Sequence, residues 1–332
     1  MVDEILRKLA SDCPLPSRCA TQVDDVQRWS TDRLGELGLP LDAAALRRLD
    51  RARFAGYACR LYPDASVADL RVITVLFTWF FLVDDACDGP AALPPERIRA
   101  LRDGTLYLLR HGPRLPHPGV TGPLRRLLVQ AWREPRRRMP YHWRVRFADA
   151  VGHHLDGVWR EAVNRTEGHT PGVDEYVRLR RATSAAYVSY PLVEFVAGRP
   201  LPEPVYHHPA LRRVGDLGND LLSWYNDLAS LERDRLTSGG QNLVLAVAAE
   251  RRVPVRAAVE LVAERWRAAM ARFLTLRAEV PSFGPALDAA VSAHLDGVAH
   301  AVRGTIDWTL ESARYGKEGP PVNASGRAGA PC

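Results

Sequence analysis

The sequence predicts an all-α protein of about ten helices in a single domain. Apolar residues recur at three- and four-residue intervals through most of the 332 residues, as on the buried face of a helix. No run of strict apolar–polar alternation flanks an Asn-Gly or Asp-Gly pair, the usual sign of a β-hairpin. Because no linker divides them, residues 1–315 are expected to form one domain. Residues 316–332, rich in Gly, Pro and Ala, are expected to form a disordered tail.

The helices follow one another along the chain with short turns between them. The first 45 or so residues predict one or two short helices around Pro14, Pro16 and Pro40. In a later segment, Val259 and Trp266 belong to an apolar stripe that charged residues do not interrupt. The remaining helices are predicted over 42–61, 66–88, 94–110, 122–133, 140–163, 174–196, 211–234, 241–250, 254–280 and 285–312.

The composition is that of an ordinary globular protein, with 46% hydrophobic and 25% charged residues and a net charge of +6. Its densest basic cluster, 133–146, is interrupted by Pro135 and Pro140. A solvated surface explains this cluster best, and attraction of an anionic small molecule is an alternative. No nucleic-acid recognition motif accompanies the cluster, so no nucleic-acid partner is expected.

The cysteines and the first residues indicate a cytoplasmic protein. The five cysteines are odd in number and lack the spacing of a metal site, so we expect reduced thiols. The first 16 residues contain no long apolar core of the kind that a secretory signal has. No stretch predicts a membrane anchor.

One apolar helix ends in a cluster of aspartates. The uncharged run from Val72 to Val83 is too short to span a bilayer, which takes about 20 residues. It leads into Asp84, Asp85 and Asp88. Asp84 and Asp88 are four residues apart and therefore share a helix face. A cation would relieve their repulsion, and oxygen ligands alone suit Mg²⁺. Exposure of these carboxylates to water is the simpler alternative.

A second polar cluster lies on a later helix. Asn219, Ser223 and Asp227 are spaced four and four, so their oxygens point into one sector of the helix. Asp220 lies to the side, where it could orient a ligand. Such residues often cover a solvated helix face. When this cluster is considered by itself, that alternative stays open. Two oxygen sites on separate helices of one domain favour several Mg²⁺ ions with a phosphate-bearing anion between them.

These motifs resemble those of the microbial class I terpene synthases over nearly the whole chain up to residue 315. Asp84 to Asp88 has the form of the family's DDxxD motif, and Asn219 to Asp227 that of NDxxSxxxE. The Arg314-Tyr315 pair matches a terminal Arg-Tyr, and Arg180-Arg181 matches the segment with a diphosphate-sensing arginine. Residues 239–244 resemble a further segment of the family, GxxHNLV.

The resemblance implies a class I helical bundle around a central apolar cavity, and an enzyme that ionises an allylic prenyl diphosphate and cyclises the cation. It implies three Mg²⁺ ions and is compatible with a homodimer. The implied metal ligands are Asp84, Asp88, Asn219, Ser223 and Asp227. The implied catalytic residues are Asp84, Asp85, Arg181, Arg314 and Tyr315, with the choice between Arg180 and Arg181 as sensor left open. The candidate aromatic residues of the substrate pocket, each of which could equally be ordinary core, are Trp79, Phe80, Phe81, Tyr187 and Trp308.

Four positions depart from the family pattern. Asp227 replaces a Glu and Asn226 a common Lys, while Ser184 and Ala185 stand where Asp and Gly are frequent. Farnesyl diphosphate (C15) is the expected substrate. A diterpene synthase acting on geranylgeranyl diphosphate or a bicyclic labdane-type diphosphate is the alternative. A chain-elongating prenyltransferase would normally carry a second DDxxD motif, and the Asn and Ser of the second cluster disfavour this class of enzyme. A non-catalytic helical scaffold is the remote alternative.

Overall fold

The computed structural model describes residues 1–39, 43–88, 92–237 and 241–312. Within these ranges the chain is helical without β-strands, apart from one isolated bridge between His117 and Val120. The predicted all-α class is therefore confirmed. The Arg314-Tyr315 pair, the tail 316–332 and the two glycines at 239–240 lie outside the described residues.

Fifteen helical segments are present in the described ranges, more than the ten or so expected, because several are short. Their bounds are α1 Val2–Asp12, α2 Val23–Glu36, α3 Ala43–Ala52, α4 Phe54–Leu61, α5 Val67–Asp88, α6 Pro95–His111, α7 Gly122–Arg138, α8 Tyr141–Glu167, α9 Val173–Thr183, α10 Ala186–Ala197, α11 Glu203–Tyr206, α12 Pro209–Thr237, α13 Leu243–Arg251, α14 Val255–Ala278 and α15 Pro285–Glu311.

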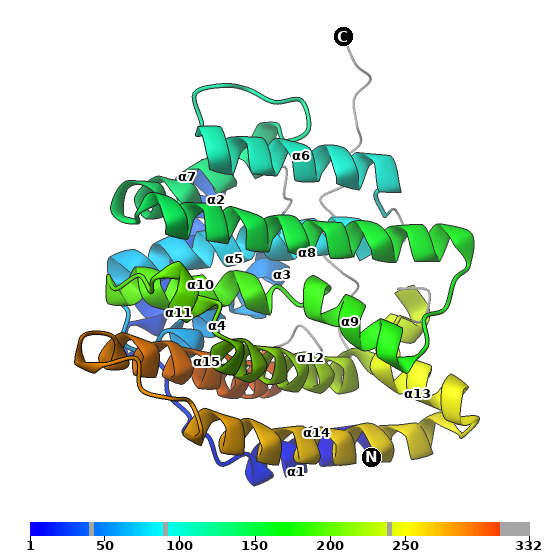
Figure 1. Ribbon diagram of the computed structural model, residues 1–332. Coiled ribbons are helices and arrows are strands. Elements are labelled where there is room, and N and C mark those ends of the chain that lie inside the picture. Colours follow the sequence, from blue (N-terminus) through cyan, green and yellow to red (C-terminus); the bar gives the residue numbers. More distant parts are fainter. Residues whose placement is uncertain (40–42, 89–91, 238–240, 313–332) are drawn as a thin grey trace.

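The long helices pack side by side around a common interior (Figure 1). Helix α12 packs against α14 and α15, α5 against α4 and α7, and α8 against α6, α9 and α10. Gly157 allows the close approach of α9 to α8, because a Cβ there would lie 2.7 Å from the Cβ of Ala182. Helices α5, α8, α9, α10 and α12 thereby surround the site described below.

Helix α5 begins as the sequence predicts and is buried along most of its length. The backbone N–H of Asp69 donates to Ser66 Oγ at 3.1 Å, which satisfies one orphan donor at the helix start. Inside the helix, Thr74 and Thr78 donate their hydroxyls to the carbonyls of Leu70 and Thr74, at 2.7 and 2.8 Å. These bonds let two polar side chains lie in the core without unpaired hydroxyls.

Two helices predicted as continuous are broken. The predicted segment 42–61 divides at Arg53, and the predicted segment 174–196 divides between Thr183 and Ala186. Arg53 and Ala185 both have positive φ, at 50° and 59°. An L-residue rarely adopts this left-handed conformation, and neither break is marked by Gly or Pro. Apolar periodicity therefore continued across both breaks in the sequence.

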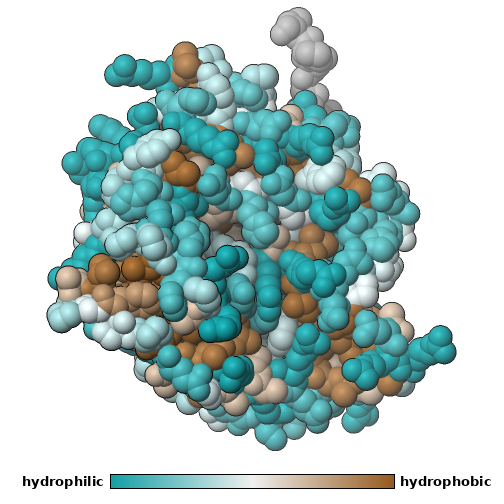
Figure 2. Space-filling model, viewed as in Figure 1, coloured by the Kyte–Doolittle hydropathy of each residue, from teal (hydrophilic) through white to brown (hydrophobic). Residues whose placement is uncertain are grey.

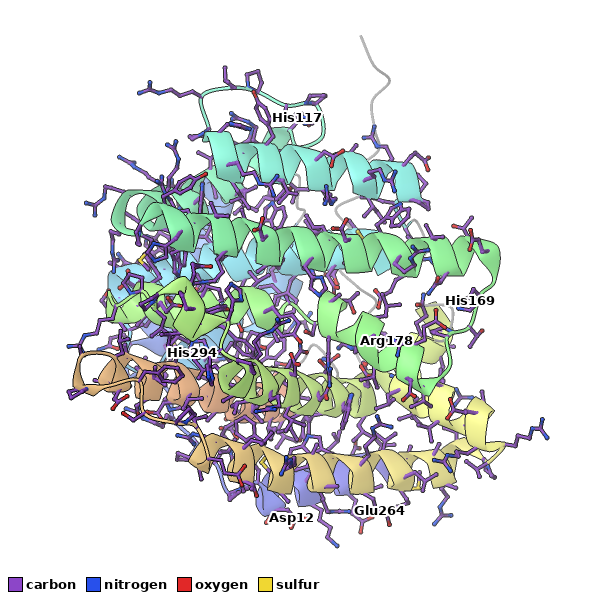
Figure 3. All side chains as sticks on the ribbon, viewed as in Figure 1. Asp12, His117, His169, Arg178, Glu264 and His294 are labelled. Carbon is purple, nitrogen blue, oxygen red and sulfur yellow. The ribbon has the colours of Figure 1, made fainter. Side chains whose placement is uncertain are left out.

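A network of ion pairs around the buried Arg146 joins α8 to α10 and α11. Arg146 on α8 donates to Glu194 Oε2 at 2.6 Å and also pairs with Glu203. Glu194 accepts the backbone N–H of Leu201 at 2.7 Å, which fixes the turn after α10. His294, labelled in Figure 3, packs its ring edge-on against Tyr206 of the same network, 5.3 Å between centroids.

The surface is mainly polar. On the face shown in Figure 2, hydrophilic residues cover most of the area and hydrophobic residues form separate patches. Among the described residues, no helix is long and apolar enough to cross a membrane.

Candidate active site

An apolar chamber lies between α4, α5, α9, α10, α12 and α15. Its lining includes stacked aromatic rings: Phe54 stacks behind Phe81 at 4.2 Å, and Tyr57 stacks on Trp308 at 4.6 Å. The empty space within the chamber, including the part of its mouth that is open to solvent, is about 940 Å³. The residues that line it are Tyr57, Leu61, Phe77, Phe80, Phe81, Asp84, His154, Arg180, Thr183, Ser184, Ala185, Ala186, Val188, Ser189, Leu222, Asn226, Arg233, Thr305 and Trp308.

A polar pocket adjoins the chamber. It contains carboxylates and guanidinium groups from α5, α8, α9 and α12, and its empty space is about 520 Å³. The lining residues are Asp84, Glu161, Arg165, Tyr176, Arg180, Thr183, Asn226, Asp227, Arg233, Asp234 and Gln241. Two predicted residues distant in sequence, Asp84 and Asp227, therefore line the same pocket.

Five residues line both cavities and form their shared wall. They are Asp84, Arg180, Thr183, Asn226 and Arg233. An elongated ligand with an anionic head and an apolar body could place its head among the charged groups and its body among the rings. The wall would then lie beside the bond that joins the two parts.

Asp227 is buried and tightly held by other protein groups. Arg180 Nε donates to its Oδ1 at 2.8 Å, and the hydroxyl of Tyr176 donates to its Oδ2 at 2.8 Å. The backbone N–H of Leu243 also donates to Oδ2, at 3.2 Å. Burial raises the pKa of the Asp227 carboxyl, while Arg180 and Tyr176 lower it. The guanidinium of Arg180 thus supplies a counter-charge for Asp227.

Asn219 and Ser223 lie beneath the chamber wall rather than in it. The Oδ1 of Asn219 accepts hydrogen bonds from Ser223 Oγ at 2.9 Å and from Ser184 Oγ at 2.7 Å. Its Nδ2 donates to the carbonyl of Arg181 at 2.8 Å. Because Nδ2 must face a carbonyl, these contacts fix the orientation of the amide with its oxygen toward the two hydroxyls. Ser184 itself lines the chamber, so this cluster lies one side chain away from it.

Arg181, Tyr187 and Trp79 lie outside both sets of lining residues. Arg181 forms a bidentate pair with Asp220, at 2.7 and 2.6 Å, and the hydroxyl of Tyr187 donates to Asp216 at 2.6 Å. Trp79 is wholly buried in the core. Of the two adjacent arginines, Arg180 is the one that reaches the shared wall.

The predicted aspartates at the end of α5 divide between wall and core. Asp84 is half-buried in the wall, and Asp85 is buried. Asp88 ends the helix, but its side chain lies outside the description. Arg165 of α8 donates to the carbonyl of Cys87 at 2.8 Å, which favours this helix end electrostatically. Phe80, Phe81 and Trp308 line the chamber.

Several lining residues were not found by sequence reasoning. Glu161 and Arg165 come from α8, Tyr57 from α4 and Phe77 from α5. None belongs to a motif, and periodicity identifies only a buried face and not the cavity it lines. Arg233 carries a weak signal, since it lies seven residues after Asn226 and therefore on the same helix face.

Two titratable groups near the site have shifted pKa values. Burial raises the pKa of the Glu161 carboxyl to about 7, against the lowering influence of Arg180. Burial lowers the pKa of His154 to about 4, so the imidazole is neutral at neutral pH. Its Nδ1 lies 3.3 Å from the carbonyl of Ala182, and its ring meets the edge of Phe80. A neutral ring suits the apolar lining to which His154 belongs.

Comparison with known proteins identifies the family. A family model described as "Terpene synthase family 2, C-terminal metal binding" matches residues 76–272. This chain belongs to that family. The match includes α5 from residue 76 onward and all of α12, the two helices that carry the aspartate-rich and Asn-Ser-Asp motifs. The chain is accordingly a terpene synthase, an enzyme that acts on a prenyl diphosphate, with the metal-binding domain of its family.

Named relatives span most of the enzyme. Pristinol synthase of Streptomyces pristinaespiralis is 26% identical over 98% of this chain and 89% of its own length. Delta(6)-protoilludene synthase of Armillaria gallica is 31% identical over 84% of this chain and 79% of its own length. Pentalenene synthase of Streptomyces avermitilis is 29% identical over 91% of each chain.

Solved structures share the fold. The crystal structure of germacradien-4-ol synthase from Streptomyces citricolor superposes with a TM-score of 0.75 at 27% identity, covering 89% of this chain and 98% of that one. That of α-eudesmol synthase has a TM-score of 0.82 at 24% identity and covers 90% and 97%. The predicted class I terpenoid synthase fold is thus confirmed.

Proposed function

We propose that this terpene synthase is a Mg²⁺-dependent cyclase that ionises farnesyl diphosphate and closes the resulting cation to a terpene hydrocarbon or alcohol. One observation carries the proposal: an aromatic chamber and a charged pocket share a wall that contains Asp84 and Arg180. An allylic diphosphate has the matching two-part form. Relatives named sesquiterpene synthases, among them one from Cyclocybe aegerita at 28% identity, favour the C15 substrate.

The donor set fits magnesium. Its members are carboxylate, amide and hydroxyl oxygens on α5 and α12, which a hard cation prefers. Within the described ranges, no three Asp, Glu, His or Cys side chains converge closely enough to hold a metal ion. The proposed donor set therefore does not consist of carboxylates alone, and it includes the amide oxygen of Asn219 and the hydroxyl of Ser223. Asp84 would hold the metals from one helix, and Asn219, Ser223 and Asp227 from the other. When bound, magnesium supplies Lewis-acid neutralisation of the charge on the diphosphate.

Arg180 has two tasks in this proposal. Without substrate it compensates the buried carboxylate of Asp227, 2.8 Å away. Because it also lines the shared wall, it can donate to a diphosphate placed there and stabilise charge as the C–O bond breaks. We assign this donor role to Arg180 rather than to Arg181, because Arg180 lines both cavities and Arg181 lines neither.

The chamber would protect and guide the carbocation. The faces of Phe81, Tyr57 and Trp308 can stabilise a positive charge that moves along the hydrocarbon of the substrate. An apolar lining also excludes water, which would otherwise quench the cation early. His154 is too weak a base to be protonated at neutral pH, so it adds no competing positive charge to the chamber.

The proposal is tested by incubating the enzyme with C10, C15 and C20 prenyl diphosphates and a bicyclic C20 diphosphate, with and without Mg²⁺. Gas chromatography identifies the products, and release of inorganic diphosphate gives the rate. A cyclic C15 product that requires Mg²⁺ is expected. Asp84→Ala should abolish diphosphate release with unchanged helix content. Cyclic C20 products alone would transfer the assignment to a diterpene synthase. Longer diphosphates, or no turnover, would refute cyclisation.

A further inference from the structure

The shared wall contains two guanidinium groups, and their surroundings differ. Arg180 is enclosed, with 15% of its side chain exposed. Its Nε is taken by Asp227 and one of its Nη atoms by Asn226, at 2.8 and 2.9 Å. These contacts hold Arg180 between two protein groups and leave little of its side chain open to solvent.

Arg233 reaches the same wall from the last turns of α12. It lies seven residues after Asn226, two helical turns away on the same face. It keeps 34% of its side chain exposed, more than twice the exposed fraction of Arg180. Its guanidinium is therefore the more accessible of the two to an anion that enters from solvent.

A buried network orients Arg233. Its Nε and one Nη donate to Asp234 Oδ1 at 3.2 and 3.1 Å. The other oxygen of Asp234 accepts from Ser230 at 2.6 Å and from Asn242 at 3.0 Å. Neighbouring residues on a helix do not ordinarily face each other, so the Arg233–Asp234 contact requires both side chains to turn. Asp234 is thereby fixed by two further residues and holds the guanidinium at the wall.

We propose that Arg233 is a substrate-binding residue that donates to the diphosphate group at the wall between chamber and polar pocket. The inference rests on the proposed function, since it takes the diphosphate of that substrate as its ligand. A guanidinium matches two diphosphate oxygens with a fork of parallel donors. With the diphosphate among the charged groups and the hydrocarbon in the chamber, Arg233 at the wall would lie near the oxygen on which negative charge grows as the C–O bond breaks. Arg233 would then contribute both to binding and to the rate of ionisation.

The test compares Arg233→Gln and Arg233→Lys with Arg235→Gln. Arg235 is a matched control because it lies on the same helical turn, is 50% exposed and pairs with Glu232, yet lines neither cavity. Titration calorimetry with inorganic diphosphate in the presence of Mg²⁺ gives the Kd, and steady-state kinetics with the accepted prenyl diphosphate give kcat and KM. Thermal unfolding of each variant reports on folding.

Arg233→Gln is expected to weaken diphosphate binding ten-fold or more and to lower kcat/KM at least as much. Arg233→Lys should recover part of the affinity because it keeps the charge without the fork, and Arg235→Gln should remain within two-fold of the wild type. A Kd within two-fold of the wild type for Arg233→Gln would overturn the inference, even if the variant were less stable. Turnover by the wild type would in that case leave the proposed function standing. Absence of turnover with all the prenyl diphosphates would sink the proposed function alone, because the diphosphate Kd still decides the role of Arg233.

Discussion

Among the buried arginine–carboxylate pairs of the described residues, two have similar geometry and different surroundings. Arg180 and Asp227 meet at 2.8 Å beside the polar pocket. Arg146 and Glu194 meet at 2.6 Å where α8 packs on α10, under the ring of Tyr206. The first pair adjoins further charges and a cavity, whereas the second binds the backbone of Leu201 and closes a turn. Burial of an ion pair does not by itself mark a site, and what adjoins the pair decides its role.

The largest effect is expected at the first pair. Asp227→Asn removes the charge that Arg180 balances and a proposed metal ligand, while keeping the shape of the side chain. We expect diphosphate release to fall more than 100-fold, equivalent to about 2.7 kcal/mol or more in the barrier. The exposed Glu232→Gln variant, on the same helix and outside both cavities, serves as the comparison for stability. Activity within ten-fold of the wild type would mean that the Arg180–Asp227 pair, like Arg146–Glu194, stabilises the fold and does not take part in the reaction.

Arg146→Met tests the second pair. The variant leaves Glu194 buried without its main counter-charge, which typically costs 3–5 kcal/mol. Burial already raises the pKa of Glu194 to about 7, and loss of Arg146 removes an influence that lowers it. Glu194 is protonated at pH 5 with or without Arg146, so the loss in unfolding free energy should be larger at pH 8.

Denaturant unfolding at pH 5 and pH 8 measures the effect of Arg146→Met, with the half-buried Arg144→Met on the same helix as the matched control. The kcat of Arg146→Met should stay within two-fold of the wild type under conditions where the protein is folded. A large fall in kcat with little change in stability would reverse the roles assigned to the two pairs.

His294, beside the second pair, should make stability sensitive to acid. Burial, aided by Arg146, lowers its pKa to about 4. Between the ordinary histidine pKa of about 6.5 and pH 4, the unfolded chain binds a proton that the folded chain does not, so stability falls as pH falls. The full shift corresponds to about 3 kcal/mol. His294→Gln should therefore flatten the fall in melting temperature between pH 6.5 and pH 4.

The exposed His142→Gln is the control for this pH series, and it should leave the slope unchanged. His154 contributes a similar shift beside the chamber, so some acid sensitivity should remain in His294→Gln. An unchanged slope in His294→Gln would show that this imidazole titrates normally and that its surroundings admit water.

The fold class could be predicted because helix periodicity is local and needs no knowledge of how the helices pack. The two helices that carry the motifs, with Asp84 and Asp227, could also be predicted, because their polar residues recur four residues apart. What the sequence could not give depends on helix packing. Tyr57 and Glu161 line the cavities only because α4 and α8 pack at particular angles, and Arg181 turns to Asp220 although it neighbours Arg180. The break at Ala185 was missed because no Gly or Pro announces it.

That break allows the smallest and most local prediction. Ala185, with φ of 59°, joins α9 to α10 beside the chamber. A left-handed conformation costs an L-residue about 1–2 kcal/mol, and glycine adopts it without this cost. After allowance for the greater freedom of glycine in the unfolded chain, Ala185→Gly should stabilise the enzyme by roughly 0.5–1 kcal/mol. The adjacent Ala186→Gly, at the first residue of α10, should destabilise it by at most roughly 0.5–1 kcal/mol, the cost of glycine in the middle of a helix. Opposite signs in denaturant unfolding would show that strain is stored at the junction that positions Ser184 against Asn219. Equal losses at both positions would show that the surrounding packing, rather than the backbone of Ala185, determines this turn.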